Sequence, residues 1–148
     1  MAFRLPRLSR LFNPATPRLR IGYAPKRNGR PDPGEVVWAW VPFEEDPSQG
    51  KDRPVLVIAC NRTTVIGLPL TSKDHDPDAA QEARAGRFWM DVGTGDWDRE
   101  HRPSEVRLDR LLRLPEADVR REGAALAREV FDEVLAAAQE FHPELRAG

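Results

Sequence analysis

Residues 34–74, GEVVWAWVPFEEDPSQGKDRPVLVIACNRTTVIGLPLTSKD, decide the fold. Three runs in this stretch are rich in Val, Ile, Leu and Trp, and turn-forming residues separate them, which predicts three consecutive β-strands. In residues 36–41 and 55–59 the apolar side chains fall on both faces of the strand. Because neither strand can leave a face in water without loss of stability, we expect a small, tightly closed barrel.

Side chains that commonly bind phosphate lie at the ends of these strands. Arg53 precedes the second apolar run, and Thr71, Ser72 and Lys73 close the third. A guanidinium, two hydroxyls and an ammonium at one rim are suited to a phosphodiester. This rim is therefore the candidate functional site.

Three motifs in the same order resemble those of the MazF/PemK (Kid) family of bacterial toxin endoribonucleases. They are GEVVW at residues 34–38, RPVLVI at residues 53–58 and PLTS at residues 69–72. The resemblance spans about residues 34–141 and implies a mainly β fold with some α structure. The expected architecture is a small SH3-like barrel of the CcdB/MazF type with a C-terminal helix.

The resemblance also implies an activity and partners. We expect the toxin of a type II toxin–antitoxin system that cuts single-stranded RNA without a metal ion or cofactor, leaving 2′,3′-cyclic phosphate and 5′-hydroxyl ends. The implied partners are a second copy of the chain and a MazE/PemI-like antitoxin, with DNA bound only through that antitoxin. The alternatives are a growth inhibitor of the CcdB kind, or a degenerate module that binds RNA or antitoxin without cutting.

Composition limits the other possibilities. A chain of 148 residues suits one domain, and its single cysteine, Cys60, excludes an intramolecular disulfide. No apolar run approaches the roughly 18 residues that a membrane span needs, and the start lacks the apolar core of a secretory signal. We therefore expect a cytoplasmic protein.

The N-terminal segment has a charge of its own. Residues 1–31 carry eight of the 23 Lys and Arg residues and no Asp or Glu. Residues 1–33 are therefore expected to form a basic, Pro- and Arg-rich arm, separate from a toxin domain at residues 34–148. The arm either binds a polyanion such as RNA, or is a disordered tail, or follows from an upstream start codon that the cell does not use.

A later strand carries further candidate site residues. In residues 103–112, Val106 and Leu108 would share one face, and Arg107 and Asp109 the other. A surface ion pair is the alternative interpretation, but the pattern resembles the strand that supplies an Arg and Asp pair in the Kid branch. The resemblance thus implies catalytic roles for Arg53, Thr71, Arg107 and Asp109, and RNA contacts for Gln49, Lys51, Ser72 and Lys73.

These groups suggest a reaction in which a 2′-hydroxyl attacks the adjacent phosphorus. Asp109 is the expected base, if burial raises its pKa, and the arginines would stabilise the developing negative charge. The Kid branch has a histidine in the loop before the second strand, whereas residues 46–49 here contain none. His75 or His101 would have to replace it, or the enzyme would work without one.

The remaining segments are assigned by composition and period. We expect a mobile polar loop at residues 43–52, a two-residue hairpin turn at Asn61 and Arg62, a surface excursion with one helical turn at residues 75–86, and a strand at residues 87–92. One strand is expected through residues 103–114, with a short helical turn after it. A helix is expected over residues 124–141, with an apolar stripe that includes Leu126, Val130 and Val134.

Overall fold

The computed structural model describes residues 18–26, 30–120 and 124–146. Its strands are β1 (Arg20–Ile21), β2 (Val36–Pro42), β3 (Gly50–Cys60), β4 (Thr64–Thr71), β5 (Trp89–Gly93), β6 (Ser104–Arg107), β7 (Leu112–Pro115) and β8 (Val119–Arg120). Its helices are α2 (Ala79–Arg84) and α3 (Arg128–Phe141), and 3₁₀ turns span Glu116–Asp118 and Pro143–Arg146. The fold is thus mainly β with a helix near the C-terminus, as the sequence predicts.

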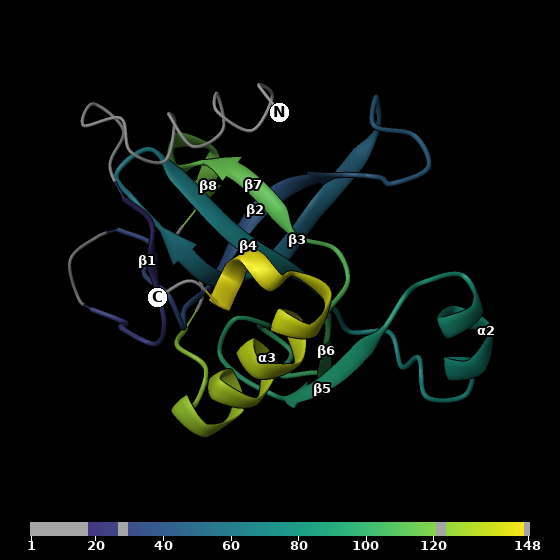
Figure 1. Ribbon diagram of the computed structural model, residues 1–148. Coiled ribbons are helices and arrows are strands. Elements are labelled where there is room, and N and C mark those ends of the chain that lie inside the picture. The colour runs from purple at the N-terminus through teal and green to yellow at the C-terminus, as the bar shows by residue number, and fades with distance from the viewer. Residues whose placement is uncertain (1–17, 27–29, 121–123, 147–148) are drawn as a thin grey trace, which may run out of the picture.

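The strands form one antiparallel sheet around β3 and β4. The order is β5-β6-β4-β3-β2-β8, while β1 pairs with β3 and β7 pairs with β4. In Figure 1, α3 lies in front of the sheet beside β5 and β6, and the α2 excursion stands out from the body on one side. The β2–β3 hairpin also projects from the body, with its loop at the tip.

Both faces of the central strands are covered, as the two-faced apolar pattern requires. One cluster contains Val36, Leu56 and Ile58 together with Phe131 of α3, so this helix covers one face. A second cluster, of smaller side chains that include Val37, Val55 and Val57, fills the other face beneath β7 and β8. Full burial of each Val or Leu side chain stabilises the fold by about 1.5–3 kcal/mol.

Close backbone packing between β3 and β4 depends on a glycine. A Cβ atom at Gly67 would lie 2.4 Å from Val55 Cγ1 and 2.8 Å from the carbonyl oxygen of Leu56. Any side chain at this position would therefore push the two central strands apart.

The described part of the N-terminal segment is attached to the sheet. Residues 20–21 pair with Ala59 and Cys60 of β3, and the Tyr23 hydroxyl donates a hydrogen bond to the carbonyl oxygen of Leu126 at 2.8 Å. Gly34 has a φ of 100°, and a Cβ atom there would lie 2.6 Å from the Tyr23 ring. The prediction of a separate arm otherwise falls on residues outside the described ranges.

Several element boundaries differ from the predicted ones. The single strand expected at residues 103–114 is two strands, β6 and β7, because residues 108–111 leave the ladder. The connection after Cys60 has three residues, since Asn61 Oδ1 accepts hydrogen bonds from the backbone N–H groups of Thr63 and Thr64. Helix α3 begins at Arg128, because residues 124–126 run along β2 and hydrogen-bond to it, with Leu126 buried ahead of the helix.

Candidate functional site

Strand pairing brings Arg53 and Thr71 to one face of the sheet. Val55 of β3 pairs with Pro69 of β4. Arg53 and Thr71 each lie two residues beyond this pair, on adjacent antiparallel strands, so their side chains leave the same face. Lys51 shares this face, because it lies two residues before Arg53 on β3.

The same face continues onto β6. Thr71 pairs with Glu105, and Arg107 follows Glu105 by two residues. Arg107 then holds Asp109 at the end of this strand, with 2.7 Å between Nη2 and Oδ2. Strand pairing thus brings the four expected catalytic residues to one face, beyond the end of the small apolar cluster that Val55 and Val57 belong to.

No described residue accepts a hydrogen bond from the guanidinium group of Arg53. Its side chain is half-buried, and burial lowers the pKa of its guanidinium, with a further lowering from the charge of Arg110 and an opposing effect from Glu45. Arg110 is fixed close by, because its Nη2 donates to the carbonyl oxygen of Pro42 at 2.6 Å. Two guanidinium groups this near to each other form a site that favours an anion.

In contrast to Arg53, the guanidinium of Arg107 donates hydrogen bonds to two carboxylates. Asp109 accepts from Nε and Nη2, and Glu44 of the β2–β3 loop lies 3.0 Å from Nη1 through Oε1 and 3.1 Å from Nη2 through Oε2. Burial alone would lower the pKa of Arg107, but the hydrogen bonds to Asp109 and Glu44 outweigh it and raise this pKa. Glu44 therefore takes the place that an anionic substrate group would occupy at Arg107.

Asp109 serves mainly to hold other groups in place. Besides Arg107, it accepts a hydrogen bond at 2.8 Å from the backbone N–H of Phe88 through Oδ1. Both of its oxygens are thus engaged as acceptors. This arrangement orients the guanidinium of Arg107, which is a different task from the proton transfer that the sequence suggested.

The expected RNA-contacting residues lie around the site at the surface. Gln49, Lys51, Ser72 and Lys73 are all exposed. The backbone N–H of Lys73 donates to Thr71 Oγ1 at 3.1 Å, which fixes the hydroxyl oxygen and leaves its proton for another acceptor. Within the β2–β3 loop, backbone hydrogen bonds join Phe43 to Gln49 and Gln49 to Asp46.

Glu105 is a titratable group that the sequence did not single out. It is buried beside Thr71 and accepts a hydrogen bond at 3.0 Å from the backbone N–H of His75. Burial, together with the nearby Asp91 carboxylate, raises the pKa of Glu105 to about 7. A carboxyl group with this pKa can take up and release a proton near neutral pH.

One of the two histidines that could replace the missing loop histidine, His75, lies beside the site, because its ring stacks on Trp89 and Trp89 pairs with Arg107. The His75 ring is buried and stacks on Trp89 with 4.2 Å between centroids, and its Nδ1 faces Asp78 and Glu82. His101 is exposed, with its Nε2 3.6 Å from Asp96 Oδ1.

Two groups of side chains have ligand atoms close enough for a cation. They are His75, Asp78 and Glu82, and Asp74, Asp76 and Glu105. In the first group Glu82 already accepts hydrogen bonds from Arg87 and from the indole of Trp89, which lower the pKa of Glu82 to about 2. Its oxygens therefore serve Arg87 and Trp89 before any metal.

The comparison with known families agrees with this geometry. A model of the "PemK-like, MazF-like toxin of type II toxin-antitoxin system" family matches residues 32–142. The chain belongs to this family.

One solved structure shows how this PemK-like toxin compares with an individual protein. A MazE–MazF crystal structure (Form-II) from Deinococcus radiodurans is 19% identical, covers 80% of this chain and 97% of its own, and has a TM-score of 0.46. No protein with a curated description matches the chain. Among the described residues, no helix is long and apolar enough to cross a membrane.

Three residues of the toxin's candidate site were not predicted from the sequence. Arg110 directly follows the Arg107 and Asp109 pair but breaks the alternation, and Glu44 is one of several acids in a polar loop. Glu105 lies two residues before Arg107, and this spacing was the signal that could have placed Glu105 in the site. A period of two places it on the same face, but only the tertiary structure shows that it is buried.

Proposed function

We propose that this toxin is an endoribonuclease that cuts single-stranded RNA without a metal ion, leaving a 2′,3′-cyclic phosphate and a 5′-hydroxyl. The observation that carries the proposal is the pair Arg53 and Arg110, with Thr71 on the same face of the sheet as Arg53. No described residue accepts from the Arg53 guanidinium, and Arg110 lies close enough to lower its pKa. A phosphodiester would fit between these donors.

Each group of the site has a role in this reaction. Arg53 and the Thr71 hydroxyl hold the phosphoryl oxygens, and Arg107 stabilises the negative charge that builds on them, because donors fixed in advance need no reorganisation. Asp109 positions Arg107. Glu105 accepts the proton of the 2′-hydroxyl, and water supplies a proton to the leaving 5′ oxygen, since the Nδ1 of His75 faces Asp78 and Glu82 and the Nε2 of His101 faces Asp96.

Access of RNA to Arg107 requires that Glu44 moves away. The Glu44 side chain is 51% exposed, and its loop joins the projecting ends of β2 and β3. Because the buried Arg107 keeps its ion pair with Asp109, an RNA phosphate can replace the Glu44 carboxylate without leaving the guanidinium unpaired. Gln49 and Lys51 at the end of this loop, with Ser72 and Lys73 opposite, would contact neighbouring nucleotides.

The decisive experiment is incubation of the purified toxin with a long RNA in EDTA. We expect cleavage that Arg53→Ala abolishes and that Arg84→Ala, a change at an exposed arginine on α2, leaves intact. Products whose 5′ ends accept phosphate from polynucleotide kinase without prior phosphatase treatment would support the 5′-hydroxyl, and a product mass lower by one water molecule than that of the 3′-phosphate would support the cyclic phosphate. Intact RNA in the presence of correctly folded toxin would contradict the nuclease.

A second candidate function is a binding module that does not cut. The occupied state of Arg107, held by Asp109 and Glu44, favours it. Bound but uncut RNA in the same assay would support this function. For either function, the toxin acts in the cytoplasm as a homodimer, and a MazE/PemI-like antitoxin silences it. Light scattering of the toxin alone, and of the toxin mixed with the protein that the neighbouring gene encodes, would test both partners.

A further inference from the structure

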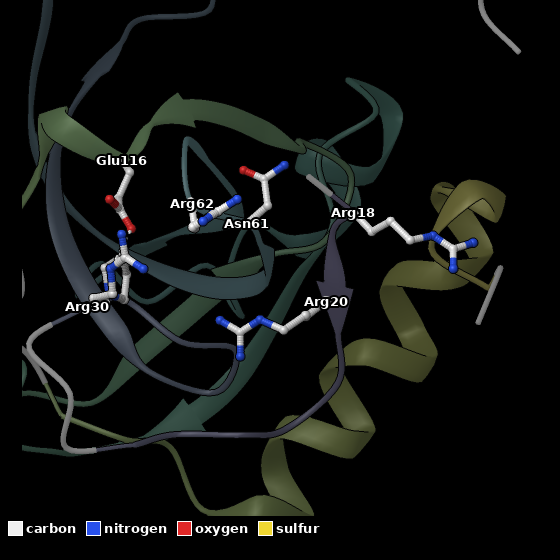
Figure 2. A pocket seen from close by; sticks show the side chains of 7 residues that line it. Arg18, Arg20, Arg30, Asn61, Arg62 and Glu116 are labelled. Carbon is white, nitrogen blue, oxygen red and sulfur yellow. Dashed lines mark ion pairs between the residues drawn. The ribbon is translucent and has the colours of Figure 1, made fainter. Parts of the chain in front are cut away.

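A hollow lined mainly by arginines lies at the opposite end of β3 from Arg53 (Figure 2). Its walls come from the N-terminal segment, the β3–β4 turn and the 3₁₀ turn after β7. The lining residues are Arg18, Arg20, Arg30, Pro31, Asn61, Arg62 and Glu116. We call this hollow the arginine pocket. Figure 2 shows Arg20, Arg30 and Arg62 near one another, whereas the Arg18 side chain extends away from them.

Arg20 is anchored yet remains at the surface. Its Nη2 donates to Asp32 Oδ1 at 3.1 Å and to Cys60 Sγ at 3.2 Å, and Asp32 is fully buried. The Arg20 side chain is nevertheless 51% exposed. Arg30 is placed similarly, with its Nε 3.8 Å from Glu116 Oε2 and 51% of its side chain exposed.

Arg62 is presented by a well-defined turn. Asn61 Oδ1 accepts hydrogen bonds at 2.8 Å from the backbone N–H groups of both Thr63 and Thr64, which fixes the turn around Arg62. Neither Arg62 nor Arg18 makes a hydrogen bond or ion pair with another residue of the described ranges. Their guanidinium groups are therefore available to a ligand.

The chemistry of the pocket favours phosphate over an acidic peptide. The lining holds four guanidinium groups and the carboxylate of Glu116, and Asp32 behind the pocket pairs with Arg20, so four cations meet two carboxylates and the local charge is positive in a chain with a net charge of −1. Pro31 is the one apolar residue in the lining. A peptide would need apolar contacts to anchor its side chains, whereas Arg presents paired donors that match phosphate oxygens.

We propose that the arginine pocket binds a phosphate group of the RNA chain, away from the cleavage site. Arg53 and Cys60 are seven residues apart on β3, which corresponds to about 23 Å. Arg18, Arg20 and Arg30 precede residue 32, where the family match begins, so residues outside the family match supply most of the arginines of the pocket. The identity of the ligand as RNA rests on the proposed function, but the preference for phosphate rests on the pocket itself.

The test measures binding of labelled, non-cleavable 2′-O-methyl RNA by fluorescence anisotropy over a range of salt concentrations. One RNA is long enough to reach both sites, and the other spans only the cleavage site. For the long RNA, each lost phosphate contact should reduce the slope of log affinity against log salt by about 0.7. We expect this reduction for Arg62→Ala and a larger one for Arg18→Ala with Arg62→Ala, while Arg84→Ala leaves the slope unchanged.

Three results would overturn the proposal. They are an unchanged slope in both variants, an equal loss for the short and the long RNA, and a polyglutamate peptide that binds the toxin more tightly than RNA through Arg62. Failure of the nuclease proposal looks different: the long RNA would bind with the expected dependence on Arg62 but stay uncut in EDTA. The two proposals can therefore fail separately.

Discussion

Replacement of Glu105 by glutamine separates catalysis from stability. The pKa of Glu105 is raised from 4.5 to about 7 because the carboxyl is buried beside Asp91. At about 1.36 kcal/mol per pH unit, this difference amounts to about 3 kcal/mol that ionisation of Glu105 costs the folded state. Glutamine keeps an acceptor for the backbone N–H of His75 and cannot ionise.

The sign of the stability effect follows from the raised pKa. Below about pH 4.5 the carboxyl is neutral in both the folded and the unfolded state, so the substitution changes little. As pH rises toward 7, the unfolded chain releases its proton first, and the wild-type protein loses stability. Glu105→Gln should therefore raise the free energy of unfolding at pH 8 by up to about 3 kcal/mol relative to its effect at pH 4.5, as measured by urea denaturation.

Activity should change in the opposite direction. If ionised Glu105 accepts the proton, the single-turnover rate of RNA cleavage rises about tenfold between pH 6 and pH 8, with a midpoint near 7. Glu105→Gln should abolish this rise and slow the reaction by about 10²–10⁴-fold. A variant that is more stable at pH 8 and cuts RNA at the wild-type rate would refute the catalytic role and leave only the electrostatic one.

Three further changes test other parts of the structure. Glu44→Gln releases Arg107, so RNA should bind more tightly, with a salt slope steeper by about 0.7; unchanged binding would contradict competition by the loop. Gly67→Ala forces a Cβ atom against Val55 and should lower the free energy of unfolding by about 1–3 kcal/mol, and an unchanged denaturation midpoint would mean that the strands adjust. Glu82→Gln should lower the free energy of unfolding at pH 7, because the pKa of Glu82 is lowered to about 2 in the folded protein. The difference in free energy of unfolding between the variant and the wild-type protein should vanish as pH falls toward 2, and a difference that persists at low pH would contradict the ion pair.

Local patterns predicted the central strands well, because each pattern has one physical solution. Apolar side chains on both faces of residues 36–41 and 55–59 required cover on both sides, and the structure supplies α3 on one face and β7 with β8 on the other. Boundaries were predicted less well where tertiary pairing decides. Residues 124–126 have a helical composition but pair with β2, and this pairing delays the start of α3 to Arg128.

The same distinction applies to the site. Alternation along residues 105–109 correctly predicted that Arg107 and Asp109 share a face, and the structure joins them by an ion pair. It could not predict that Glu44, far away in the sequence, occupies the other side of Arg107. Charge partners that come from a distant loop, and the burial that raises the pKa of Glu105, exist only in the folded chain.

In the proposed reaction, the two arginines of the site would act at different steps. Arg53, with donors that no described residue uses and a pKa lowered by burial and by Arg110, gains most from the first anion that arrives. Arg107 already has its charge balanced by Asp109 and Glu44, and it gains only when a stronger negative charge replaces the Glu44 carboxylate. Charge on the phosphoryl oxygens is greatest in the transition state, so Arg107 would contribute more to that state than to substrate binding. This difference has a kinetic consequence: Arg53→Ala should mainly raise KM, whereas Arg107→Ala should mainly lower kcat.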